Sequence, residues 1–203
     1  MINVNPGYLA FLVMTISVVL LASGWKTILL RGFSDRNILL FFVLWVGIGS
    51  FSFTLAGVEV HLDLVVLAVS ALATAASRRS QPLVLAHIGV SALLLGVLGF
   101  VLEELEGSVP WLPSRHPLIE RSLFLATVAV MMSREPVIQF ASTGLALCLA
   151  ETFGVFVRPY MGMGGWEFQD QVWLTLFAAR IGAVTLETSL KLALQVGRRI
   201  RKD

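Results

Sequence analysis

Charge is what this sequence has least of. Asp, Glu, Lys and Arg together make up 14% of the 203 residues, whereas soluble domains carry about 25%. Hydrophobic residues make up 57% of the chain, and the mean hydropathy is +0.84. This composition excludes a soluble globular protein and predicts a chain that lies mostly within a lipid bilayer.

Cysteines and catalytic motifs are also scarce or missing. The single cysteine, Cys148, lies within an apolar run, which excludes an intramolecular disulfide and a cysteine-based metal site, so we expect it to be a packing residue. The sequence contains no HExxH zinc motif, no GxSxG nucleophile motif and no GxxxxGK[ST] phosphate loop. It therefore predicts neither an enzyme nor a bound cofactor or metal.

The apolar residues gather in runs that predict an all-α bundle of seven membrane-spanning helices. The loops between the runs are too short to form a separate core, so residues 1–203 are expected to form one integral membrane domain. The shortest run is the fifth, because Glu120 and Arg121 leave only twelve uncharged residues in it. It is either a full span or one arm of a re-entrant hairpin formed with the sixth. The predicted spans are 8–30, 37–57, 60–77, 82–102, 118–133, 136–157 and 171–196.

Lysine and arginine positions predict the orientation. With the N-terminus outside, eleven of these residues face inward, three face outward and one, Arg180, lies in the membrane. Because basic residues favour the inner side, we expect the N-terminus outside and the C-terminus inside. Topology explains these bases, so no nucleic-acid partner is expected; the expected partners are the bilayer, other membrane proteins or a second copy of the chain. The basic tail RRIRKD either attracts anionic lipid or retains the C-terminus inside.

Two ionisable residues, Glu151 and Arg180, lie well inside apolar runs. A charge in hydrocarbon needs a partner or water. Glu151 lies about fifteen residues into the run 136–157 and Arg180 about nine residues into the run 171–196. At about 1.5 Å per residue these antiparallel positions differ in depth by about one helical turn. The sequence therefore predicts an intramembrane ion pair, which either fixes the helix register or couples a proton or cation to transport.

A second set of polar residues is expected near the inner ends of the spans. Glu187 and Lys191 have the i, i+4 order that favours a helix salt bridge. His87 lies at a comparable depth, so a proton path through Glu151, Arg180, Glu187 and His87 can be drawn. The alternative is that His87 is simply solvated at the end of its span.

Acidic residues form a predicted outer cluster of Glu59, Asp63, Glu103 and Glu104. The first two occur in the stretch EVHLD, and the other two in the stretch EELE. On a helix His61 would point away from both acids of EVHLD, so three metal ligands cannot come from this stretch alone. The cluster is either a set of solvated carboxylates, favoured at a helix N-terminus by the dipole, or a weak cation site.

The layout of the chain resembles one known family. The N-terminal run ending in Trp25 and Lys26, the short-looped spans and the tail GRRIRKD are similar to those of the YphA-like membrane proteins of spore-forming bacteria. The resemblance implies a protein of the bacterial cytoplasmic membrane that contributes to spore envelope assembly. It carries over no functional residues.

These observations predict a non-enzymatic membrane protein that acts as an accessory or assembly factor. The predicted spans are too few and too poor in polar groups to line a wide pathway. The alternative is a small proton- or cation-linked transporter, or a channel component, that uses Glu151 and Arg180.

Overall fold

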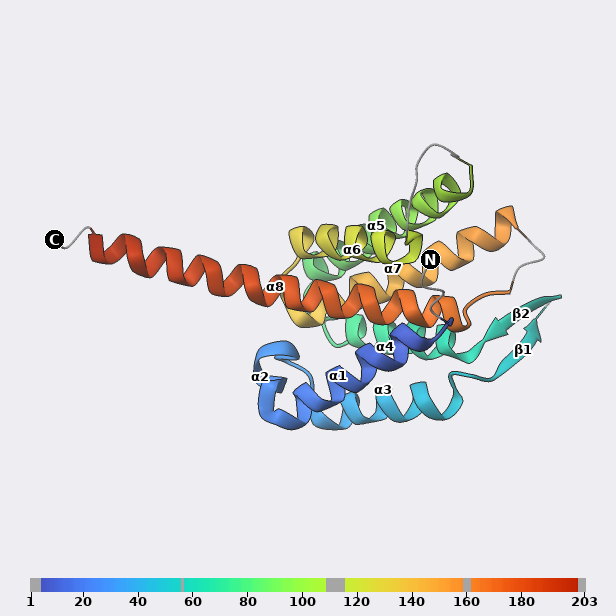
Figure 1. Ribbon diagram of the computed structural model, residues 1–203, viewed down its shortest axis with the longest axis horizontal. Helices are drawn as coiled ribbons and strands as arrows, with labels where there is room; N and C mark the ends of the chain where they lie inside the picture. Colours follow the sequence, from blue (N-terminus) through green and yellow to red (C-terminus); the bar gives the residue numbers. More distant parts are fainter. Residues whose placement is uncertain (1–4, 56, 109–115, 159–161, 201–203) are drawn as a thin grey trace.

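A computed structural model describes residues 5–55, 57–108, 116–158 and 162–200 (Figure 1). It confirms a helical bundle, to which one short β-hairpin is added. Three of its helical stretches are long and apolar enough to cross a membrane, namely Tyr8–Leu29, Pro82–Glu106 and Pro136–Val157. The elements are α1 (Tyr8–Leu20), η1 (Leu21–Trp25), α2 (Lys26–Leu29), α3 (Asp35–Ile48), β1 (Ser52–Leu55), β2 (Val58–His61), α4 (Leu62–Ala76), α5 (Pro82–Ser108), α6 (Pro117–Met132), α7 (Pro136–Val157) and α8 (Trp166–Ile200).

Prolines mark the start of three helices. Pro82, Pro117 and Pro136 are the first residues of α5, α6 and α7, where the missing N–H of proline is not needed. Helix α3 is instead capped by Ser34, whose Oγ accepts a hydrogen bond of 3.2 Å from the main-chain N–H of Asn37. These local signals explain why the predicted runs 82–102, 118–133 and 136–157 begin close to where the helices do.

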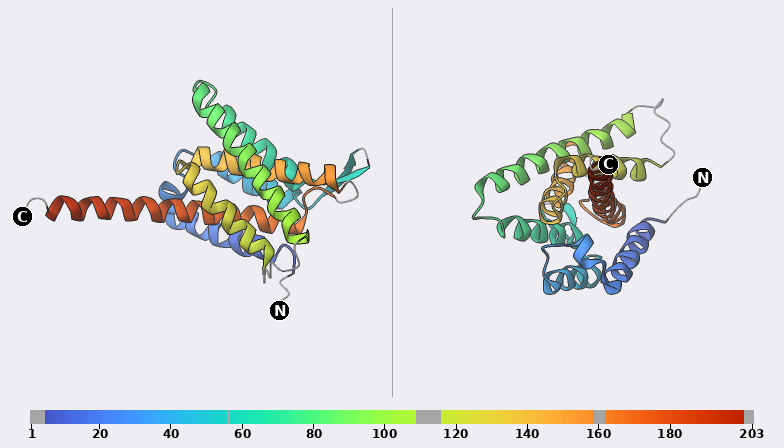
Figure 2. Two further views of the ribbon diagram at one scale, coloured as in Figure 1. Left: turned by 90° about the horizontal axis from the view of Figure 1, so that it is seen from above. Right: turned by 90° about the vertical axis from the view of Figure 1, so that its left-hand side faces the viewer.

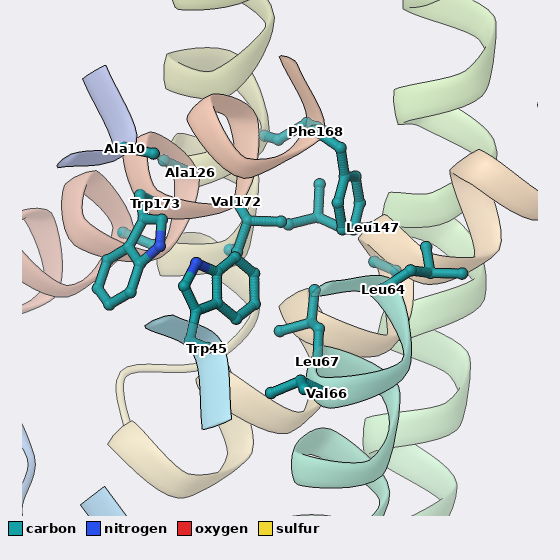
Figure 3. Close-up of a cluster of buried hydrophobic side chains, with 14 of the residues drawn as sticks. Ala10, Trp45, Leu64, Val66, Leu67, Ala126, Leu147, Phe168, Val172 and Trp173 are labelled. Atoms are coloured by element: carbon teal, nitrogen blue, oxygen red, sulfur yellow. The ribbon is translucent and has the colours of Figure 1, made fainter. Parts of the chain in front are cut away.

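Helix α7 forms the centre of the bundle. It packs against α5 and α4, while α8 packs against α6 and α1 (Figures 1 and 2). The apolar core lies between these helices and includes Trp45, Leu147, Val172 and Trp173, which come from α3, α7 and α8 (Figure 3). Gly96 allows α5 to approach α7 closely, because a Cβ at this position would lie only 2.9 Å from the Cβ of Leu149 on α7.

A β-hairpin stands where the sequence predicted the end of one span and the start of the next. Helix α3 ends at Ile48, and β1 and β2 (Ser52–Leu55 and Val58–His61) pair antiparallel, with Ser52 opposite His61. The predicted boundaries of the spans 37–57 and 60–77 are therefore wrong here. The alternation of polar and apolar residues in SFTL and VEVH suits a strand, and Gly57, at φ 86°, permits the tight turn.

The first predicted span, 8–30, is not one straight helix. Its helical geometry is interrupted at Gly24, which has a φ of 89°. Glycine adopts this left-handed conformation without a Cβ penalty. The short helix α2 follows the interruption, so the chain turns before α3 (Figure 1).

Helix α8 is longer than predicted at both ends. It contains 35 residues and begins at Trp166 rather than at Gln171. At 1.5 Å per residue it is about 52 Å long. Figure 1 shows its C-terminal half continuing beyond the other helices.

Candidate functional site

The polar residues collect at two ends of the bundle. The hairpin end carries β1, β2 and the start of α8, on the right of Figure 1. The Arg180 end carries α2 and the α6–α7 connection. Arg180 lies there because its guanidinium donates hydrogen bonds of 2.9 Å to the main-chain oxygens of Arg134 and Ile28.

Two arginines neutralise the acidic end of α5 at the hairpin end. Arg158, just after α7, lies 2.6 Å from Glu103 and 3.0 Å from Glu104. Arg121 of α6 lies 3.3 Å from Glu103 and 3.5 Å from Glu106. The hydrogen bond from Arg158 to Glu103 raises the pKa of the Arg158 guanidinium, which therefore stays charged. The network joins α5, α6 and α7.

Two further carboxylates hold the segment before α8. Asp63 of α4 is fully buried, and its carboxylate accepts hydrogen bonds of 3.0 Å from the N–H of Gly165 and 2.7 Å from that of Leu64. Glu151 of α7 accepts a hydrogen bond of 3.3 Å from the N–H of Gly164. The same segment pairs with the hairpin, because the N–H of His61 donates to the oxygen of Met163 at 2.9 Å. These bonds fix where α8 begins.

A sixth carboxylate, that of Asp170, caps α1. It accepts hydrogen bonds of 2.8 Å from the N–H of Gly7 and 2.6 Å from that of Ala10. A carboxylate in this position satisfies free main-chain donors and complements the helix dipole. Sequence analysis missed this role; the available signal was the polar stretch EFQDQ, which is unusual in a chain so poor in charge.

The structure does not bring Glu151 and Arg180 together, so the predicted ion pair is wrong. Glu151 binds Gly164 at the hairpin end, whereas Arg180 binds main-chain oxygens at the opposite end. The prediction placed the start of the last helix at Gln171, but α8 begins at Trp166. Arg180 is therefore fourteen residues along α8, and the two side chains are about 20 Å apart along the bundle.

The other predicted inner residues are not gathered into a path. His87 is exposed on the first turns of α5, and Lys191 is exposed where α8 has left the bundle. Glu187 is half-buried on α8, about 10 Å from Arg180 along the helix. Because Glu151 lies at the hairpin end, the proton path drawn through these residues is not formed.

The predicted outer acidic cluster separates into three environments. Glu103 and Glu104 face Arg158, and Asp63 is buried, which contradicts the expectation that it is solvated. Glu59 is exposed and accepts a hydrogen bond of 2.6 Å from the Oγ of Ser52. Within the described ranges, no three His, Cys, Asp or Glu residues are placed to hold one metal ion.

No family model, curated protein or solved structure matches this chain. The resemblance to the YphA-like proteins therefore remains a prediction from the layout of the sequence. In the structure, the charged residues of the hairpin end bind one another and the main chain.

Proposed function

We propose that this chain is a non-enzymatic, multi-pass protein of the bacterial cytoplasmic membrane that serves as an accessory or assembly factor for other membrane proteins. The observation that carries the proposal is the C-terminal half of α8. It leaves the bundle with an apolar face on which Leu186, Leu190 and Leu194 are 39%, 46% and 64% exposed, while Leu192, which is 62% exposed, lies on another side of the helix. Residues four apart share a helix face, and such a face is suited to bind the helix of a partner.

The hairpin end supports the same proposal. Its carboxylates bind arginines or main-chain N–H groups, so they hold α1, α4, α5, α7 and α8 in fixed positions. A bundle fixed in this way provides a rigid base for the projecting helix. The accessory role and its alternative, a proton- or cation-linked transporter, both gave Glu151 and Arg180 a joint role; these residues lie at opposite ends, so neither reading gains support from them as a pair.

The layout of the sequence extends the proposal further. Its similarity to the YphA-like proteins supports a role in spore envelope assembly. The excess of Lys and Arg predicted on one side supports an inward-facing C-terminus. The projecting part of α8 would then meet its partner on the inner side of the membrane.

Site-specific photocrosslinking in cells tests this proposal. A benzophenone-bearing amino acid in place of Leu190 is expected to give an adduct with another membrane protein. The same amino acid in place of Gln195, which is polar, exposed and about 140° around α8 from Leu190, is the matched control and is expected to give none. Equal adducts from both positions would contradict a specific apolar contact. An adduct of twice the mass of the chain would replace the accessory role with self-association.

A further inference from the structure

A cavity of about 460 Å³ lies between α1, α3, α4 and α8. Cavities that bind small molecules have volumes of about 300–1,000 Å³. This one begins at the Arg180 end and reaches the middle of the bundle, where Trp173 forms part of its wall. The accessory role proposed above makes no use of it.

The lining of the cavity changes from polar to apolar along its length. Ser34, Asn37 and Ser77 lie at the Arg180 end, together with Arg180 itself. Deeper in the bundle the wall is formed by aromatic and aliphatic side chains, including those of Phe42 and Trp173, whose ring centroids are 5.4 Å apart. The cavity therefore suits a molecule with a polar head and an apolar chain.

Arg180 supplies a positive charge without an ion-pair partner, and an acid that acts on it, Glu187, lies about 10 Å away along α8. Its guanidinium binds two main-chain oxygens, and its Nε is buried without a hydrogen-bond partner. None of the ion pairs between described residues includes it. A partly buried charge of this kind favours an anion.

Trp173 gives a second, independent indication of a ligand. Its side chain is only 6% exposed, it lines the cavity, and its Nε1–H has no hydrogen-bond partner among the described residues. A buried donor without a partner destabilises the fold. A polar atom of a bound molecule would remove this destabilisation.

The position of Arg180 matches the level of lipid phosphates. Its acceptors lie in the α6–α7 connection and in α2, and both segments lie at one end of the bundle, which is where the surface of a bilayer around a spanning bundle is expected. Basic pockets between membrane helices at this level bind lipid head groups. The apolar wall extends from there towards the hydrocarbon core.

We infer that this cavity binds an anionic phospholipid of the surrounding bilayer, with its phosphate at Arg180, an ester carbonyl accepting from the Nε1–H of Trp173 and the acyl chain that follows it along the wall at Phe42. The second chain stays in the bilayer. A free phosphate ion does not explain the cavity, because most of its wall offers no hydrogen bond.

Native mass spectrometry tests this inference on the full chain, purified in mild detergent with equal amounts of phosphatidylglycerol and phosphatidylcholine bearing the same acyl chains. The wild-type protein is expected to retain phosphatidylglycerol about tenfold more than phosphatidylcholine, because one bond to a charged group is worth about 1.5–3 kcal/mol. Arg180→Gln should remove the preference. Arg134→Gln is the matched control: it removes an exposed charge at the same end but keeps the main-chain oxygen that Arg180 binds.

A second pair of variants keeps the test decisive if Arg180→Gln does not fold. Ala73 lines the cavity, so Ala73→Phe should lower the retention of phosphatidylglycerol at least about tenfold. Leu72→Phe, on an exposed neighbouring position outside the cavity, should not. Equal retention of both lipids by the wild type, retention of a free fatty acid instead, or an unchanged preference in folded Arg180→Gln would overturn the inference.

Discussion

Arg158 forms ion pairs with two neighbouring carboxylates, those of Glu103 and Glu104. Arg158→Gln leaves Glu103 and Glu104 without their shared cation. We expect the free energy of unfolding to fall by about 1–2 kcal/mol, less than for a fully buried pair, because solvent screens these partly exposed side chains. Thermal unfolding in detergent should show a Tm lower by several degrees.

Two further variants test whether the lower Tm of Arg158→Gln comes from repulsion between the two carboxylates. Arg79→Gln removes an exposed arginine and should leave the Tm almost unchanged. Glu104→Gln in the Arg158→Gln background should restore part of the loss, since it removes one of the two repelling charges and leaves the ion pair of Glu103 with Arg121 in place. A double variant less stable than Arg158→Gln alone would contradict this account.

The sequence identified the two residues that needed partners but not the partners. Glu151 and Arg180 stand out because they are charged within apolar runs. Their partners are the main-chain N–H of Gly164 and the main-chain oxygens of Arg134 and Ile28. Every residue carries such groups, so no pattern of side chains reveals which of them a buried charge will use.

Among the elements, helix starts were more predictable than helix ends. Pro117 and Pro136 are local signals, and α6 and α7 begin on them. The hairpin had a weaker signal, because short apolar runs suit both a strand and the end of a helix. Its strand β2 is also stabilised by the distant Met163, a contact that depends on tertiary structure.

Two glycines test how tightly the hairpin end is packed. Gly57 and Gly164 both have a positive φ, but a Cβ at Gly57 meets nothing, whereas one at Gly164 would lie 2.5 Å from Oδ1 of Asp63. Gly57→Ala should therefore lower stability only by the strain of about 1–2 kcal/mol. Gly164→Ala should lower it further, measured as a greater loss of Tm. Equal losses would show that the Asp63 contact does not constrain this segment.

The composition of the whole molecule was sufficient to predict a helical membrane bundle, but it did not predict the cavity. The low charge and long apolar runs follow directly from the solvent that surrounds the protein. The size of a cavity depends instead on how far apart α1, α3, α4 and α8 are held, and that distance depends on contacts such as those of Arg180 with the chain on either side.

The orientation of the whole molecule is a prediction that cysteine labelling can check. In a Cys148→Ala background, Ser80→Cys lies between α4 and α5 at the Arg180 end, and Thr54→Cys lies in β1 at the hairpin end. With the N-terminus outside, an impermeant thiol reagent on intact cells should label Thr54→Cys and leave Ser80→Cys unlabelled until the cells are opened. The reverse pattern would show the opposite orientation.

The length of α8 determines how far from the membrane a partner bound to it would lie. Twenty residues of α8 follow Arg180, so with Arg180 at the level of the lipid phosphates, as proposed above, about 30 Å of the helix would lie beyond the membrane surface. The partner proposed to bind α8 would then be held at a fixed distance from the bilayer by a rigid helix rather than by a flexible linker. Deleting four residues from this segment would bring the partner about 6 Å closer to the membrane and rotate the binding face of the helix by about 40°.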